Sequence, residues 1–217
     1  MKPIVFCNIA YMKYYRGVIK DIDEPVNGGK YVTENNDGGE CYNFEPVSFT
    51  DGEMMFGYVM PPSNTEKLHI ENIIGCAGAK KENVINNVIV VWCAKENDHR
   101  STRVVGWYRN ATVYRFGQVL QFDDGYEQYF NFVADRRVCI LLPEEERRKT
   151  RWYVPHGGKK GKDFGFGRSN IWYAKGSEEN AELAEFLKTM INQIESYNGN
   201  DLIDEEVTNG CFYMGKL

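Results

Sequence analysis

The sequence predicts an α+β fold: a mainly antiparallel, strongly curved sheet or a β-barrel, with an amphipathic helix near the C-terminus. Three observations support this prediction. Aromatic residues make up 14% of the 217 residues and glycine occurs 21 times, a composition that suits short strands joined by tight turns. Apolar runs of strand length recur between turn signals. One stretch, residues 177–195, has sustained helical periodicity.

The strand predictions follow the apolar runs along the chain. The run at residues 87–95 is the clearest, because a continuous apolar stretch bounded by polar residues is typical of a central strand covered on both faces. Asp124-Gly125 predicts a hairpin between its flanking runs, and proline is expected to end two of the strands. The predicted strands lie at residues 3–10, 52–62, 87–95, 104–116, 118–123, 128–135 and 136–143.

The helix prediction rests on capping and on an apolar stripe. Ser177 can cap the N-terminus, and Glu178 and Glu179 suit the positive end of the helix dipole. The stripe has the i, i+3, i+4 spacing of a helix that packs onto a sheet; it consists of Leu183, Phe186, Leu187, Met190, Ile191 and Ile194. We expect a single domain over residues 1–196 and an acidic tail or linker over residues 197–217.

The net charge of −5 conceals a sharp division of charge along the chain. Residues 147–175 contain nine basic residues and one acid, whereas residues 176–206 contain nine acids and one base. Residues 99–116 contain four arginines and no acid. A chain divided in this way is expected to present a basic surface, which favours a nucleic-acid partner.

Few motifs favour an enzyme, a metal site or a cofactor. The chain has no GxSxG elbow and no P-loop, its six cysteines form no CxxC pair, and its three histidines are scattered, so we expect no metal and no cofactor. It has no signal peptide and no apolar run of membrane length, which predicts a cytoplasmic protein with reduced thiols. A nuclease or other hydrolase with a dispersed carboxylate site stays open as an alternative, with Asp51, Glu53, Glu66 or Asp98 as its candidates and His156 as a further one.

Aromatic, basic and amide side chains are interleaved in four clusters, "YMKYYRG", "GGECYNF", "VVGWYRNATVYR" and "TRWYVPHGGKK". Aromatic faces stack on bases, basic groups contact phosphate, and asparagine can pair with a base edge. The run at residues 104–116 is strand-like, yet neither of its two faces is cleanly apolar. The clusters therefore favour a nucleic-acid-binding surface over a strand that only closes a core.

Several sequence segments resemble those of a known family. "CNIAYMKYYRG", "NGGKYV", "DGGECYNF", "VIVVWCA", "RVVGWYRNATVYR" and "FGFGRSNIWYA" resemble the N-terminal domain of bacterial multidomain proteins of the restriction type, over about residues 3–175. That domain is similar to the PUA-like (EVE-like) readers of modified bases, which are small β-barrels with an aromatic pocket. The resemblance implies a base pocket drawn from Trp107, Tyr108, Asn110 and Tyr114, with Tyr14, Tyr15 and Asn43 beside them.

The resemblance also implies a partner and a role. The expected ligand is double-stranded DNA that carries a modified base, in defence against foreign DNA, with an effector nuclease in the same or a partner chain. This chain ends at Leu217 without a nuclease motif, so a stand-alone reader and one module of a longer polypeptide both stay open, as does RNA. A protein-interaction module is a further alternative. The expected phosphate contacts are Arg103, Arg109, Arg115, Arg151, Lys159, Lys160, Lys162 and Arg168.

Overall fold

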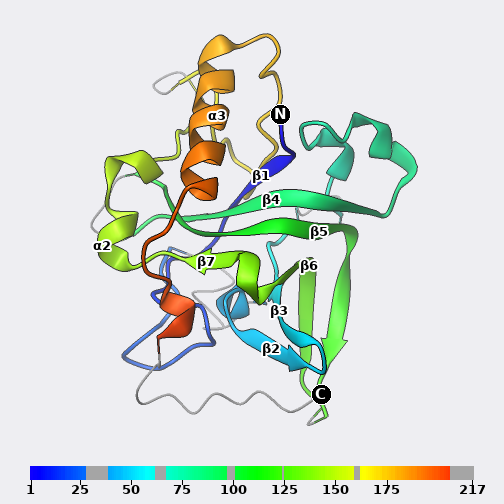
Figure 1. The fold of residues 1–217 in the computed structure, drawn as a ribbon, viewed down its shortest axis with the longest axis vertical. Helices are drawn as coiled ribbons and strands as arrows, with labels where there is room; N and C mark the ends of the chain where they lie inside the picture. Colours follow the sequence, from blue (N-terminus) through cyan, green and yellow to red (C-terminus); the bar gives the residue numbers. More distant parts are fainter. Residues whose placement is uncertain (28–38, 62–66, 97–100, 124, 159–161, 206–217) are drawn as a thin grey trace.

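The computed structural model describes residues 1–27, 39–61, 67–96, 101–123, 125–158 and 162–205, and it has a mixed α+β fold. The strands are β1 (Ile4–Asn8), β2 (Pro46–Phe49), β3 (Gly52–Gly57), β4 (Val84–Ala94), β5 (Arg103–Gln121), β6 (Glu127–Asp135), β7 (Cys139–Leu141) and β8 (Ile171–Trp172). The helices are α2 (Glu144–Arg147) and α3 (Ala181–Glu195), with short 3-10 turns between elements (Figure 1).

All the described strands belong to one curved sheet in the order β2-β3-β6-β5-β4-β1-β8, and β7 pairs with β5 beside this path. The sheet is not closed into a barrel, since its path ends at β2 and β8. β1 and β4 form the one parallel pair among the described strands, and the other pairs are antiparallel. The prediction of a mainly antiparallel, curved sheet is therefore confirmed.

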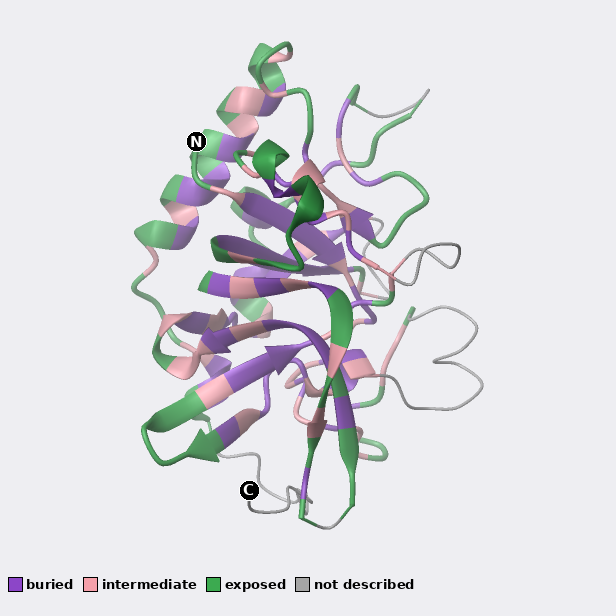
Figure 2. Cartoon of the chain, turned by 90° about the vertical axis from the view of Figure 1, so that its right-hand side faces the viewer, coloured by how far each residue is buried: buried purple, intermediate pink, exposed green. Residues whose placement is uncertain are grey.

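The central strands are buried on both faces, which explains their continuous apolar runs. On one face Val5, Val90 and Trp92 join a core formed with the N-terminal loop and the segment that begins at Gly39. On the other face Phe6 and Val91 join a second core under α3. The same pattern appears in Figure 2, where the middle of the sheet is buried and α3 turns its buried side toward it.

The helix α3 packs through the predicted stripe but begins later than expected. Its buried residues are Leu183, Leu187, Met190, Ile191 and Ile194. Asn180 caps the N-terminus, because its side chain accepts a hydrogen bond from the Leu183 backbone N–H at 3.0 Å. Ser177 lies in the turn before this cap, so the prediction of Ser177 as the capping residue is wrong. Asn180 and Ser177 are both favoured capping residues, and the local chain path decides between them.

The strand β5 is a single element that joins two predicted strands. It pairs with β4 and β7 through its first half and with β6 through its second half. The pairing with β6 is broken between Val113 and Gln118, and there β5 bends away from the rest of the sheet (Figure 1). We call the hairpin beyond this bend, residues 116–131, the arm. The predicted strand at residues 136–143 is shorter in the structure, because residues 136–138 form a 3-10 turn before β7.

The first part of the predicted tail is docked onto the sheet. Asp201 accepts hydrogen bonds from the backbone N–H groups of Leu141 and Ile203, and it forms an ion pair with Arg136 at 3.0 Å. Leu202 and Ile203 are buried in the core opposite α3. Residues 206–217 lie outside the described residues. None of the helices in the described ranges combines the length and the apolar character that a bilayer crossing needs.

Candidate nucleic-acid interface

The two aromatic side chains at the centre of the predicted base pocket point to opposite faces of the sheet. Trp107 is fully buried under α3, where its ring lies 5.3 Å from those of Trp152 and Tyr197. Tyr108 is fully buried on the other face. Neighbouring residues of a strand alternate in direction, so these two rings cannot line one cavity. The expectation of a shared pocket around both rings is corrected on this point.

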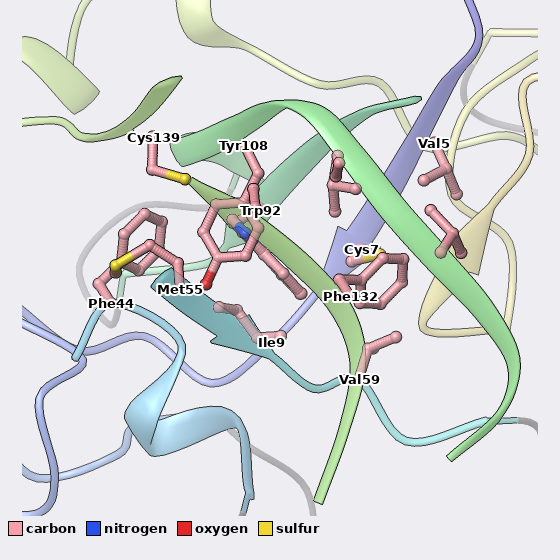
Figure 3. Packing of buried hydrophobic residues seen from close by; sticks show 14 of the residues in the cluster. Val5, Cys7, Ile9, Phe44, Met55, Val59, Trp92, Tyr108, Phe132 and Cys139 are labelled. Carbon is pink, nitrogen blue, oxygen red and sulfur yellow. The ribbon is translucent and has the colours of Figure 1, made fainter. Parts of the chain in front are cut away.

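Two further predicted pocket residues, Tyr15 and Asn43, do lie close to Tyr108, but inside the core. The rings of Tyr15 and Tyr108 lie 5.8 and 5.5 Å from the ring of Phe44, and the Tyr108 hydroxyl donates to the backbone carbonyl of Asn43. The Asn43 side chain pairs with the backbone N–H and C=O of Tyr58 at 2.8 and 3.0 Å. Figure 3 shows Tyr108 and Phe44 among the packed residues of this core. Their polar groups are used within the protein and hold the 39–45 segment against the sheet.

The remaining pocket candidates are separated along the chain. Asn110 is exposed and has a positive φ of 52°, at an irregularity where the side-by-side pairing of β4 and β5 shifts. Tyr114 is half-buried, with its ring 5.7 Å from that of Phe130. Tyr14 is half-buried in the N-terminal loop. Asn110 is therefore the exposed candidate of the seven, whereas Tyr14 keeps some exposure while it packs against the core that contains Tyr108.

The arginines of β5 have mainly structural roles. Arg115 is buried: it forms an ion pair with Glu71 at 2.7 Å and donates to the backbone carbonyls of Glu82 and Ala79. The expectation that Arg115 contacts phosphate is therefore corrected. Arg103 is half-buried and donates to the Lys149 carbonyl at 3.1 Å. Arg109 is also half-buried.

Many of the basic side chains in segment 147–175 form ion pairs with acidic side chains. Some of these acids are close in sequence and others are distant. Arg151 and Lys149 both form ion pairs with Glu146. Burial alone would raise the pKa of Glu146, but hydrogen bonds from Lys149, Arg151 and Trp152 lower it to about 2. Lys162 pairs with Glu182 at 3.2 Å. The exposed basic side chains of the segment also include Arg168 and Lys175, whereas Lys159 and Lys160 lie outside the described residues.

The turn at residues 11–15, inside the cluster "YMKYYRG", is held by a buried carboxylate. Asp23 accepts hydrogen bonds from the backbone N–H groups of Lys13, Tyr14 and Tyr15. Burial raises the pKa of Asp23, and these three hydrogen bonds oppose the shift. Tyr15 has a φ of 53°, a strained value for a residue with a large side chain. Such strain persists only where the surroundings determine the backbone, and it is concentrated at functional sites.

A buried guanidinium holds the same turn from the other side. Arg147, at the end of α2, donates to the backbone carbonyls of Met12 and Lys13 at 2.8 and 2.6 Å and to that of Leu142 at 2.7 Å. Its guanidinium also lies 5.6 Å from the centre of the Tyr11 ring. Asp23 thus fixes the N–H groups of residues 13–15, and Arg147 fixes the C=O groups of residues 12 and 13. We call this arrangement the clamp.

The clamp presents Lys13 and Tyr14 on a surface beside α2. The Lys13 amine lies 4.8 Å from the centre of the Tyr14 ring and 3.7 Å from a Glu144 carboxylate oxygen. Arg148, half-exposed, lies on the same side of the molecule and pairs with Glu96 at 2.6 Å. Figure 1 shows α2 at the end of the sheet beside the end of β4. We call the surface formed by Lys13, Tyr14, Arg103, Arg148 and Lys149 the rim.

Within the described residues there is little support for a metal site, a carboxylate active site or a nucleophilic cysteine. No group of three or more His, Cys, Asp or Glu side chains there could hold a metal ion. Asp51 and Glu53 are exposed at the β2–β3 turn, and Glu66 and Asp98 lie outside the described residues. Burial raises the pKa of the Cys7, Cys93 and Cys139 thiols, which suits packing and not nucleophilic attack.

A groove of about 740 Å³ lies between residues 136–140 and residues 199–205, with Glu53 on its wall. Arg136 lines it but already forms ion pairs with Asp201 and Asp204. Its remaining carboxylates give it a mixed, mainly acidic character, which does not suit a nucleic acid.

Sequence reasoning missed the residues that make the rim rigid. Asp23 and Arg147 are 124 positions apart, and both stand among other charged residues, so their burial had no visible signal. The cluster "YMKYYRG" was the useful signal, because it drew attention to the turn itself. No family model, curated protein or solved structure matches this chain.

Proposed function

We propose that this chain is a non-catalytic nucleic-acid-binding module that uses the rim as its contact surface. The observation that carries the proposal is the clamp. Two buried side chains of opposite charge, Asp23 and Arg147, fix the backbone of residues 12–15 by five hydrogen bonds. A turn held this tightly loses little conformational entropy when a ligand binds to its side chains.

The side chains on the rim suit the backbone of a nucleic acid. Lys13 and Arg148 carry partly exposed cations that are ion-paired with Glu144 and Glu96, and phosphate oxygens would take the place of these carboxylates. The half-exposed ring of Tyr14 offers a stacking face beside the Lys13 amine. Phosphate contacts of this kind give affinity without sequence preference.

The resemblance supports the finer part of the proposal. A PUA-like reader would bind double-stranded DNA that carries a modified base, and it would act with an effector nuclease in defence against foreign DNA. The unclosed, strongly curved sheet is compatible with a relative of such barrels that remains open. The nature of the modified base is a question for arrays of oligonucleotides with plain and modified bases.

The test is the salt dependence of binding by Lys13→Gln. Fluorescence anisotropy with a labelled duplex should show that log Kd varies linearly with the logarithm of the salt concentration. Loss of one phosphate contact should lower that slope by about one unit, because each contact releases about one counterion. Lys188→Gln is the matched control, since Lys188 is exposed on α3, away from the rim.

Tyr14→Ala should weaken binding without changing the slope, because stacking releases no counterions; its cost should be about 1–3 kcal/mol. Equal slopes for Lys13→Gln, Lys188→Gln and the unmodified protein would contradict the proposal. So would an affinity that does not change between low and moderate salt.

A further inference from the structure

The outer edge of the arm carries backbone groups that point away from the hairpin. Phe122 donates its backbone N–H to the Tyr126 carbonyl at 2.9 Å across the hairpin. In an antiparallel pair, residues that exchange such hydrogen bonds alternate with residues whose N–H and C=O groups point away from the partner strand. The register of β5 and β6 therefore directs the backbone groups of Val119 and Gln121 outward, whereas those of Leu120 point to β6.

No described strand pairs with β5 along this outer edge. The pairing of β4 with β5 starts at Val84 and Tyr114, and at the base of the arm Lys67 forms an isolated bridge with Phe116. Beyond Phe116, within the described ranges, β6 is the one strand that pairs with β5. In Figure 1 this part of β5 runs down the right-hand side of the molecule, with β6 on its inner side. Residues 117–121 are therefore an open edge strand.

The arm is held in place by one of its two faces. That face packs on the β2–β3 hairpin through a small apolar cluster formed by Val47, Phe56, Phe122 and Phe130, with Leu120 packed against it. The opposite face carries an exposed apolar pair, since Val119 and Tyr129 face each other across the hairpin and are 47% and 54% exposed. A strand fixed in this way loses little conformational entropy when it pairs with another.

This edge lacks the usual protection against pairing. Proteins normally protect edge strands by charged side chains, by proline or by making the strand very short. The two end strands of the sheet follow this rule, because β2 begins at Pro46 and β8 has two residues. In contrast, residues 116–121, "FGQVLQ", contain no charged residue and no proline.

The absence of charge also indicates which strand fits the edge. When a strand pairs with its own copy about a two-fold axis, its charged side chains come close to identical charges, and like charges opposite each other are destabilising. The neutral segment 116–121 pairs with its own copy without this cost. A strand from a different protein would need side-chain pockets or charges for its selection, and this segment has no charge to offer.

We propose that this edge is a dimer interface, at which β5 pairs antiparallel with β5 of a second copy of the chain. The two-fold axis would pass beside Val119, so that Val119 faces the same residue of the second copy and Gly117 faces Gln121. This register matches outward-pointing backbone groups with outward-pointing ones. It also places Val119 and Tyr129 of both copies side by side on the exposed face of one continuous sheet. The proposal does not rest on the rim.

The first experiment compares backbone amide hydrogen exchange of the full chain by NMR at about 20 µM and about 1 mM protein. The paired segments are short, so we expect a concentration-dependent dimer with a Kd of about 0.1 mM. The monomer fraction then falls from about 0.8 to about 0.2, so exchange at Val119 and Gln121 should slow about four-fold. Leu120 is the internal control, because its N–H points to β6 in monomer and dimer alike and its exchange should not change.

Equal exchange of Val119 and Gln121 at the two concentrations would overturn the proposal. Slow exchange at both would show that another part of the same chain covers this edge. Rapid exchange at both would leave the edge to a strand from a different protein.

The second experiment tests the register by charge, with NMR translational diffusion as the measure of size. Val119→Lys should remain a monomer at about 1 mM, because two like charges would meet at the axis, and Val119→Glu should behave in the same way. An equimolar mixture of the two variants should restore the dimer, since opposite charges then meet. Ile22→Lys is the matched control: Ile22 is 48% exposed and lies outside the arm, so this variant should dimerise like the unmodified protein.

Three results of the second experiment would each overturn the proposal: a dimer that persists in Val119→Lys, a mixture that stays monomeric, or a dimer that is lost in Ile22→Lys. Val119 is about half exposed, so its substitutions should leave Tm unchanged. If Val119→Lys does not fold, the exchange experiment still decides, because it uses the unmodified protein.

Discussion

Replacement of Arg147 by methionine tests whether the clamp fixes the rim. The side chain is 2% exposed, and it donates three hydrogen bonds to backbone carbonyls, those of Leu142, Met12 and Lys13. Methionine fills similar space but leaves these three acceptors without their donors. It also removes a positive charge that, in the intact protein, opposes the rise that burial causes in the pKa of Asp23.

The expected cost of Arg147→Met is about 3–5 kcal/mol, the range found when one partner of a buried charged network is removed. For a chain of this size that loss lowers Tm by about 10 °C. Arg147→Lys should recover part of the loss, because the amine keeps the charge but cannot reach three carbonyls at once. Urea unfolding with a linear extrapolation measures both variants.

Arg137→Met is the control for Arg147→Met. Arg137 is exposed and pairs with Asp135 on the surface, so its loss should leave the urea midpoint unchanged. A cost below about 1 kcal/mol for Arg147→Met would refute the reasoning, because buried carbonyls would then be satisfied without the guanidinium. Full stability of Arg147→Lys would refute the requirement for a planar group with several donors.

Two further predictions concern stability. Burial raises the pKa of Glu40 from 4.5 to about 7. Between these pH values the folded state therefore binds more protons than the unfolded state. The free energy of unfolding should fall by up to about 3 kcal/mol as the pH rises from 4.5 to 7. Glu40→Gln should remove this part of the pH dependence, and urea midpoints that change equally with pH in both proteins would argue against it. Trp107→Ala should cost about 3–5 kcal/mol, since the ring is packed against Trp152 and Tyr197; a stable variant that loses only ligand binding would restore Trp107 to a binding role.

The sequence predicted the central strands because their signals are local, but it missed β2 and β8, the short strands at the two ends of the sheet. Apolar runs such as residues 87–95 and the turn at Asp124-Gly125 carry their own structural preference. The helix stripe was equally visible, although its first residue was not, since Ser177 and Asn180 are both acceptable caps. The open edge of the sheet could not be predicted, because closure depends on how strands far apart in sequence meet.

The same reasoning failed for the pocket at residues 104–116. Mixed faces suggested a strand shared between a core and a ligand, whereas the first half of β5 is covered on both faces and both Trp107 and Tyr108 are core residues. Gly106 interrupts the apolar pattern of this strand for a packing reason, because a Cβ atom there would lie 2.4 Å from the Ile140 carbonyl oxygen. A strand with two covered faces and a tight glycine contact looks like a binding strand in sequence alone.

Charge counting failed for a different reason. Segment 147–175 is basic in sequence, but Arg148 pairs with Glu96 and Lys162 pairs with Glu182, and both acids lie outside the segment.

The contact surface is tested most directly by mapping backbone amide signals of the full chain by NMR during titration with a short duplex at low salt. We predict that the shifts concentrate at residues 11–15 and 148–149 and that they vanish as salt is raised. Shifts confined to other surfaces, or none at any salt concentration, would contradict binding at the clamped turn.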